Sequence, residues 1–142
     1  RDLHSFPTRR SSDLNAVTRF YIHENALHAP PGTQRIMNEQ VLHLTLVAAQ
    51  QRCTIRVVPA AAGLHGALVG PFRLMEFRDH GPLVFVENLT SSLFLEEARD
   101  IGVYRAALGR LAEAALDEGQ SREFLVRLAN EHDILEDRYE FP

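Results

Sequence analysis

The stretch "CTIRVVP", residues 53–59, predicts a β-strand that Pro59 ends. Upstream of this strand, residues 34–50 place apolar side chains at spacings of three and four, which predicts an amphipathic helix, and Thr33 stands where a helix cap is expected. Before the break at "HAPPGT", the stretch "AVTRFYIHE", residues 16–24, is rich in β-forming residues and predicts another strand with at least one buried face. The first half of the chain therefore predicts a strand, a helix and a strand.

Downstream of "CTIRVVP", an Ala- and Gly-rich loop leads into three further strands. The predicted strands are "PFRLMEF" (71–77), "PLVFVEN" (82–88) and "SSLFLE" (91–96). The turn "RDHG" joins the first two, and its Gly81 suits a left-handed backbone conformation, so we expect these two strands to form an antiparallel hairpin.

The hydrophobic period changes from strand to helix after Glu96. Apolar residues from Ile101 to Leu116 follow a helical seam, and Asp117 with Gln120 resembles a capping box that opens a last helix to about His132. The prediction is thus five strands and three helices. We expect an α+β fold with one mixed, mainly antiparallel sheet of about five strands and three helices packed on it.

Residues 1–14 differ from the rest of the chain because they are polar, rich in arginine and without a helical or strand period. The string "HSFPTRRSSDL", residues 4–14, resembles one reading frame of a common sequencing-library adapter. We therefore expect residues 1–14 to be a non-native leader, the alternative being a disordered native tail. We expect residues 15–142 to form a single domain, and the natural protein to continue upstream of it.

Composition and charge exclude several classes of protein. Hydrophobic residues make up 45% of the chain and charged residues 24%, as in a soluble globular domain, and no apolar run approaches the length of a membrane span. A single cysteine, Cys53, cannot form an internal disulfide, which with the lack of a signal peptide predicts the cytoplasm. The net charge is −4, and the leader's three Arg and two Asp leave about −5 on residues 15–142, which disfavours binding of nucleic acid.

Common catalytic and metal-binding motifs do not fit the sequence. In "HENALH" the two histidines, His23 and His28, are five residues apart, whereas the zinc-binding HExxH helix places them four apart. The serines of "LTSS" lack the glycine-flanked elbow of a hydrolase, and Cys53 is expected to be a small core residue. The glycine-rich loop 63–70 has neither the Walker lysine nor GxGxxG. We therefore predict no metal, no cofactor and no catalytic residue.

Four polar residues stand in otherwise apolar settings: Glu24, Gln40, His65 and Glu87. Glu24 and Glu87 each end an apolar strand, Gln40 interrupts the buried seam of a helix, and His65 lies in the loop after Pro59. An unpaired buried carboxylate is costly, so each of these groups needs a partner or a ligand. One interpretation is that they converge at a small ligand- or partner-binding cleft, and the other is that each caps a backbone group or pairs with an arginine.

A series of short strings resembles a known bacterial domain. The strings are "E-x-A-L" from Glu24, Gln40 with "LHL" just after it, "IRVVP" then "AGLHG", "GPFRLMEF", "VFVE", "LFLEE", Tyr104, and "AAL-x-x-x-x-S" from Ala114 to Ser121. In order and spacing, from about Ala16 to His132, they are similar to the C-terminal domain of unknown function found in actinobacterial XRE-family helix-turn-helix regulators, the Scr-type antitoxin-like transcriptional regulators.

This resemblance implies a regulatory domain that binds an effector or a partner and follows a helix-turn-helix domain, which is missing here. It implies a small partner protein encoded nearby, binding of DNA only through the missing N-terminal domain, no membrane association, and a homodimer as a further option. It supplies no catalytic residue. The rival interpretations are a small hydrolase that uses Glu24, Glu87 and His65, and a pure dimerisation module without a ligand.

Overall fold

The computed structural model describes residues 16–29, 32–63 and 70–139, with side chains to residue 131. In chain order the elements are β1 (Thr18–His23), α1 (Glu24–His28), α2 (Gln34–Ala48), β2 (Cys53–Val58), the 3₁₀ helix η2 (Ala60–Ala62), β3 (Phe72–Met75), β4 (Leu83–Glu87), β5 (Ser92–Leu95), α3 (Ala98–Ala114) and α4 (Glu118–Tyr139). All five predicted strands are present, and the α+β class is confirmed. None of the described helices combines the length and apolar character that crossing a membrane requires.

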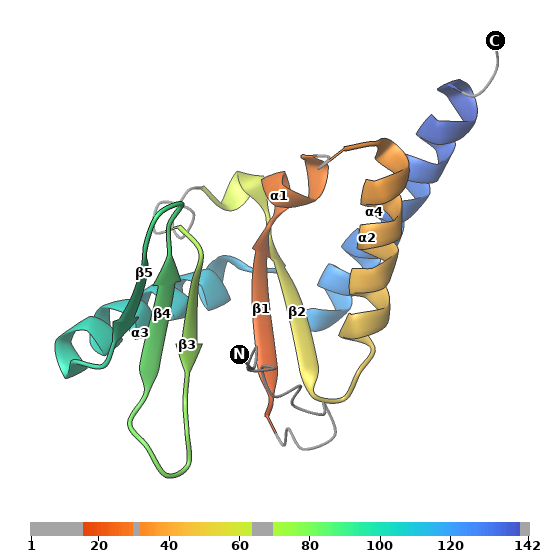
Figure 1. Cartoon of the computed structure of the whole chain (residues 1–142). Helices are drawn as coiled ribbons and strands as arrows, with labels where there is room; N and C mark the ends of the chain where they lie inside the picture. Colours follow the sequence, from red (N-terminus) through yellow and green to blue (C-terminus); the bar gives the residue numbers. More distant parts are fainter. Residues whose placement is uncertain (1–15, 30–31, 64–69, 140–142) are drawn as a thin grey trace, which may run out of the picture.

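The strands form two separate sheets, so the expectation of one five-stranded sheet is wrong (Figure 1). β1 and β2 pair in parallel, with Phe20 opposite Ile55 and Ile22 opposite Val57. β3, β4 and β5 form an antiparallel meander, which confirms the hairpin predicted for residues 71–88. The parallel pair is joined through α1 and α2, as parallel strands need a crossover connection.

The two-stranded sheet ends at β2 because another segment occupies the outer edge of that strand. The carbonyl of Val57 accepts the backbone N–H of Leu116 at 2.8 Å, and its N–H donates to the hydroxyl of Ser121 at 3.0 Å. Both backbone groups therefore point away from β1 and are already paired. No further strand can bond to β2 at this position, which is why the meander does not extend the parallel sheet.

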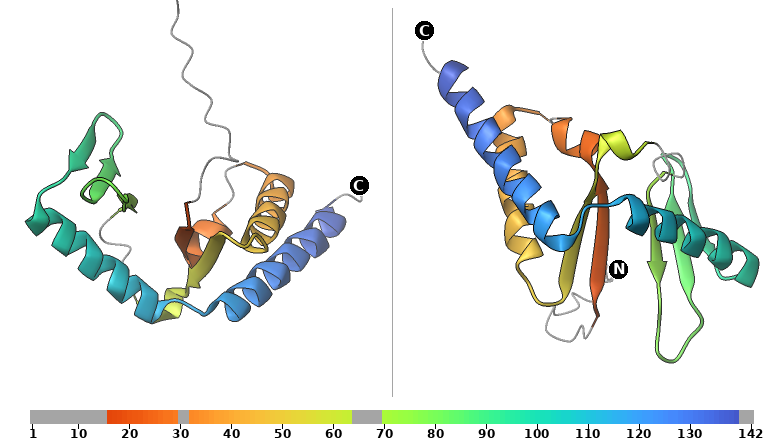
Figure 2. Two further views of the ribbon diagram at one scale, coloured as in Figure 1. Left: turned by 90° about the horizontal axis from the view of Figure 1, so that it is seen from below. Right: turned by 180° about the vertical axis from the view of Figure 1, so that it is seen from behind.

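The larger core lies between the parallel sheet and helices α2 and α4. We call β1, β2, α1, α2 and α4 the parallel unit. The buried residues of its hydrophobic core cluster are Leu27, Met37, Val41, Ile55, Val57, Leu125, Leu128 and Ala129. Figure 2 shows α2 and α4 side by side along this unit, and the two helices contact each other extensively.

The smaller core lies between α3 and one face of the meander. We call β3, β4, β5 and α3 the antiparallel unit. Val84 of β4 and Ile101 and Ala107 of α3 are buried, and the rings of Phe72 and Tyr104 lie 4.8 Å apart between centroids. In Figure 2, α3 runs along one face of the three strands and the opposite face is left open by the described elements.

The side chain of Arg56 joins the two units. Its Nε donates to the carbonyl of Leu116 at 2.7 Å, and Nη2 donates to the carbonyls of Ala112 and Ala115 at 2.9 and 2.8 Å. These carbonyls lie at the C-terminal end of α3, where backbone acceptors lack intrahelical partners and the helix dipole favours a cation. The guanidinium also lies 5.7 Å from the ring centroid of Tyr21. One residue of β2 thus fixes where α3 ends.

Local capping signals in the sequence are confirmed. Thr33 caps α2 through its hydroxyl, which accepts the N–H of Ile36. Asp117 and Gln120 form the predicted reciprocal capping box of α4, with bonds of 2.8 and 3.1 Å. This last helix continues to Tyr139, beyond the predicted end near His132. The described residues form four α-helices instead of the three predicted, because α1 was not expected.

Two local expectations are wrong. Glu24 does not end a strand; it opens the short helix α1, whose cap is the His23 ring that accepts the N–H of Asn25. Gly81 does not adopt a left-handed conformation; the described residues with positive φ are Gly63 and Gly70. The turn "RDHG" therefore closes the hairpin without the conformational freedom that only glycine supplies.

Candidate functional site

An apolar groove of about 340 Å³ opens between β1, α1 and α2. Its lining residues are Ile22, Ala26, Leu27, Ala29, Met37, Gln40, Val41 and Leu44. The volume lies in the range of pockets that bind small molecules or anchoring side chains. Because three elements contribute walls, the groove is more enclosed than a depression on the surface of a single helix.

The position of α1 shapes the groove, and Glu24 holds α1 in place. The Oε2 atom of Glu24 accepts the backbone N–H of Ala60 at 2.7 Å, which links the start of α1 to η2 beyond the end of β2. The Oε1 atom lies 3.6 Å from Nε2 of His28, one turn further along α1. Leu27 then packs into the core and leaves the small side chains of Ala26 and Ala29 to form the wall of the groove.

Gln40 supplies the polar side chain of the groove. It is exposed on α2, so the expectation that it lies on the buried seam is wrong. The buried positions of α2 are Met37 and Val41, both part of the predicted apolar pattern, whereas Ile36 is half exposed. An exposed amide beside an apolar groove can both donate and accept a hydrogen bond, which suits a mainly apolar ligand with one polar group.

The other predicted site residues lie in different places. Glu24 and Gln40 are on the neighbouring elements α1 and α2, but Gln40 lines the groove and Glu24 does not. Glu87 is exposed at the end of β4, opposite Ser92, in the antiparallel unit. His65 lies outside the described residues. The structure thus brings Glu24 and Gln40 to one unit and places Glu87 in the other.

The histidines around Glu24 have structural contacts. Nδ1 of His23 caps α1, and the ring of His28 lies edge-on to the ring of Phe124 on α4, 6.4 Å between centroids. Across the described part of the chain, no three His, Cys, Asp or Glu side chains are grouped as a metal ion would require. Cys53 is a free, partly buried thiol packed against the larger core.

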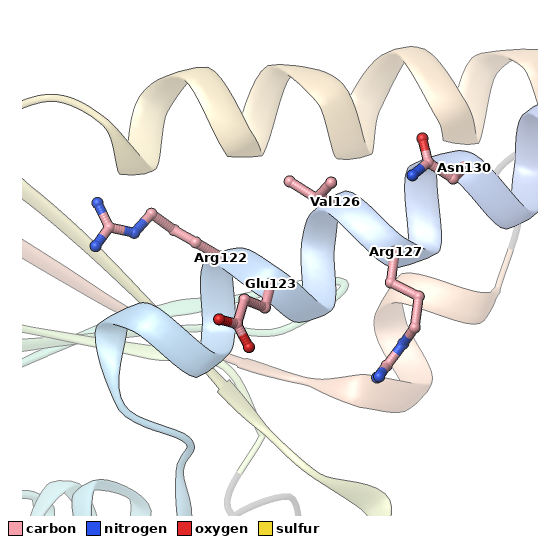
Figure 3. A pocket seen from close by; sticks show the side chains of 5 residues that line it. All are labelled: Arg122, Glu123, Val126, Arg127 and Asn130. Atoms are coloured by element: carbon pink, nitrogen blue, oxygen red, sulfur yellow. The ribbon is translucent and has the colours of Figure 1, made fainter.

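A second depression lies on the surface of α4 (Figure 3). Its lining residues are Arg122, Glu123, Val126, Arg127 and Asn130. Val126 and Asn130 point toward α2, whereas Arg127 points away from it. All five residues come from one helix, so the depression has no opposing wall, and we regard the α1–α2 groove as the stronger candidate site.

Sequence reasoning missed α1, and with it the groove residues Ala26 and Ala29. A signal was present, because "ENALH" combines an acidic first turn with helix-forming Ala and Leu. Five residues are too few for a helical period to be recognised against the preceding strand. Arg56 was missed for another reason, since its three acceptors are more than fifty residues away in the sequence.

The chain belongs to the family described as "Domain of unknown function (DUF5753)", whose model matches residues 7–127. This range covers both units up to the middle of α4. No curated protein matches the chain, and no solved structure matches it.

Proposed function

We propose that this chain is the regulatory domain of an XRE-family helix-turn-helix transcriptional regulator with an antitoxin-like role, and that it binds an effector or a partner protein. The observation that carries the proposal is the α1–α2 groove, which combines an apolar lining with one exposed amide. Such a surface suits recognition of an apolar group with one hydrogen-bonding function. The family match over most of the chain agrees with the string-by-string resemblance on which the regulator assignment rests.

The arrangement of carboxylates favours binding over the hydrolase alternative. That alternative needs Glu24 and Glu87 at one reaction centre, but Glu24 lies on α1 of the parallel unit and Glu87 on β4 of the antiparallel unit. Glu24 is also engaged with the backbone of Ala60 and with His28, as expected of a group that fixes local structure.

The partner is expected to be the small protein encoded by the adjacent gene. The test is a titration of the chain with that protein, followed by sedimentation velocity. We expect a saturable complex that Ala26→Trp weakens at least tenfold, because an indole at this position fills the groove. Asn25→Trp is the matched control, since it adds the same bulk on α1 at a position that does not line the groove. Lack of a complex, or equal effects of the two variants, would contradict this assignment.

A second experiment addresses DNA. Because residues 15–142 carry a charge of about −5, we expect no sequence-dependent shift of DNA by this chain at physiological salt. Fused to a helix-turn-helix DNA-binding domain, the same domain should repress a reporter, and the adjacent protein should change that repression. Tight, specific DNA binding by residues 15–142 alone would contradict the proposal.

A further inference from the structure

The open face of the antiparallel unit carries a row of three side chains in register. Phe72 packs against Tyr104 of α3, which defines the face that α3 covers. On the opposite face Arg73, Phe85 and Phe94 lie directly across from one another on β3, β4 and β5. The Arg73 guanidinium lies 5.8 Å from the Phe85 ring centroid, and the Phe85 and Phe94 centroids are 5.0 Å apart.

The row ends at β5, which is an edge strand of the sheet. Its sequence "SLFL" contains no proline and no charge, two of the devices that protect an edge from pairing with another chain. The side chain of Phe94 is 64% exposed on the open face, and that of Leu93 is 52% exposed on the face toward α3. Leu89, in the turn before β5, is fully exposed. Apolar side chains therefore flank this edge on both faces of the sheet.

The edge of β2 provides a direct contrast within the same molecule. There the backbone groups of Val57 are bonded to Leu116 and Ser121. At β5, the strand order places one neighbour, β4, on one side of the strand, and Figure 1 shows β5 at the side of its sheet that faces away from β1. Unlike β2, β5 is in a position to accept a further strand.

Carboxylates stand at both ends of β5. Glu87 is exposed and lies opposite Ser92 at one end, while Glu96 and Glu97 are exposed and follow Leu95 at the other. Arg73, the cation of the open face, is two strands away with its charge over Phe85. A segment that is apolar in the middle and basic at both ends would complement this edge in both hydrophobicity and charge.

We propose that β5 is the docking edge for an extended segment of a partner protein, added as a fourth strand, with apolar residues at its centre and a basic residue at each end. The inference rests on the proposed function, because it assumes that the domain binds a partner. Main-chain hydrogen bonds to β5 supply affinity, and alternate side chains supply specificity, as in other cases of strand addition.

The register of the sheet sets the spacing of the partner's side chains. On the open face its successive positions meet Ser92 and Phe94, and the next position reaches the end of β5, where Glu96 follows the strand; two basic residues therefore stand four positions apart with an apolar residue between them. Ser92 is small, which lets a long basic side chain pass over it toward Glu87, two strand spacings or roughly 9–10 Å away. The positions between them meet Leu93 and Leu95 and are apolar.

The test uses the full chain and two labelled peptides, one with the core Lys-Val-Phe-Val-Lys and one with Glu-Val-Phe-Val-Glu, each flanked by Gly-Ser. Fluorescence anisotropy should give a saturable Kd below about 1 mM for the basic peptide, and binding of the acidic peptide at least tenfold weaker. Phe94→Thr should weaken the basic peptide at least tenfold, and a cooperative melting curve should show that the variant remains folded. Leu46→Thr, which removes a comparably exposed apolar side chain from α2, is the matched control.

The outcomes separate the alternatives. Absent binding, equal binding of the two peptides, or equal effects of Phe94→Thr and Leu46→Thr would overturn the inference. A dimer at micromolar concentration that Phe94→Thr converts to a monomer would assign the edge to a second copy of the chain and overturn it as well. The peptide test requires neither the adjacent-gene protein nor Ala26. A failure of the peptides to bind therefore does not contradict the proposed function, and a failure of the groove test does not change the interpretation of the peptide result.

Discussion

The parallel and antiparallel units differ in how completely helix packing and hydrogen bonds cover the faces and edges of their sheets. In the parallel unit, helices α2 and α4 pack on one face of the sheet, and the outer edge of β2 is closed at Val57 by hydrogen bonds to the Leu116 N–H and the Ser121 hydroxyl. In the antiparallel unit, α3 covers one face, while Phe94 and Leu93 stay exposed at the edge. The comparison shows that hydrogen bonds within the chain close the edge of β2 at Val57, whereas the edge of β5 carries exposed apolar side chains that a partner could cover.

The two units also differ in core size and in the candidate binding surface that each carries. The parallel unit has the larger core and contains the groove whose wall depends on Glu24 and Ala60. The antiparallel unit is joined to it by Arg56 and by the segment between α3 and α4. Substitutions in the core and at the junction of the units test this description.

Leu125→Ala should break the parallel unit. Leu125 is completely buried among residues of α2, β2 and α4, so the truncation removes apolar contacts and leaves a cavity. We expect the free energy of unfolding to fall by about 2–5 kcal/mol in urea denaturation. Val126→Ala is the control, because Val126 is 47% exposed and should change stability by less than about 0.5 kcal/mol. Similar losses for both variants would place the core elsewhere.

Arg56→Ala should loosen the junction between the units. It removes the donors to Ala112, Ala115 and Leu116, and we expect a loss of about 1.5–3 kcal/mol, the range for hydrogen bonds to a charged group. Amide hydrogen exchange should accelerate in the last turn of α3 more than in the middle of α2. Arg56→Lys keeps the charge but not the fork of donors, so its effect should be intermediate. Uniform acceleration over both units would argue against a role confined to the junction.

Ser121→Ala should reopen the edge of β2. The buried N–H of Val57 would lose its acceptor, at a cost of about 1–3 kcal/mol measured by thermal or chemical unfolding. Thr45→Ala is the control: its hydroxyl donates to the carbonyl of Val41, which the helix backbone itself can satisfy, so its removal should cost less. A loss no greater than that of the control would show that the serine does not close the edge.

Asp117→Ala should have the smallest of these effects. It removes the side chain that accepts the N–H of Gln120 at the start of α4, and we expect a loss of about 1 kcal/mol. Asp117→Asn should stay close to the unsubstituted protein, since Asn is also a good cap. If Asn is as harmful as Ala, the carboxylate charge matters more than its hydrogen bond.

The candidate site was less accessible to sequence reasoning than the fold. Gln40 was singled out because it stands near apolar residues, but its place one position off the buried seam became visible only in the packed helix. Glu24 was singled out as a carboxylate needing a partner, and that partner is a backbone N–H contributed by Ala60, 36 residues later. A residue's need for a partner can be predicted from its chemistry, whereas the partner's identity depends on how the chain returns to it.

Short-range patterns in the sequence were enough to predict most of the local elements of this protein. The five strands, the Thr33 cap and the Asp117–Gln120 capping box follow from residues close to one another in the chain, because strand pattern and helix caps are short-range effects. Tertiary structure alone decided how the strands divide into two sheets. Val57 is bonded to Leu116 and Ser121, about sixty residues away, and once those bonds form, the edge of β2 is closed to the meander. Competition for backbone hydrogen bonds between distant segments has no signature in any short stretch of sequence.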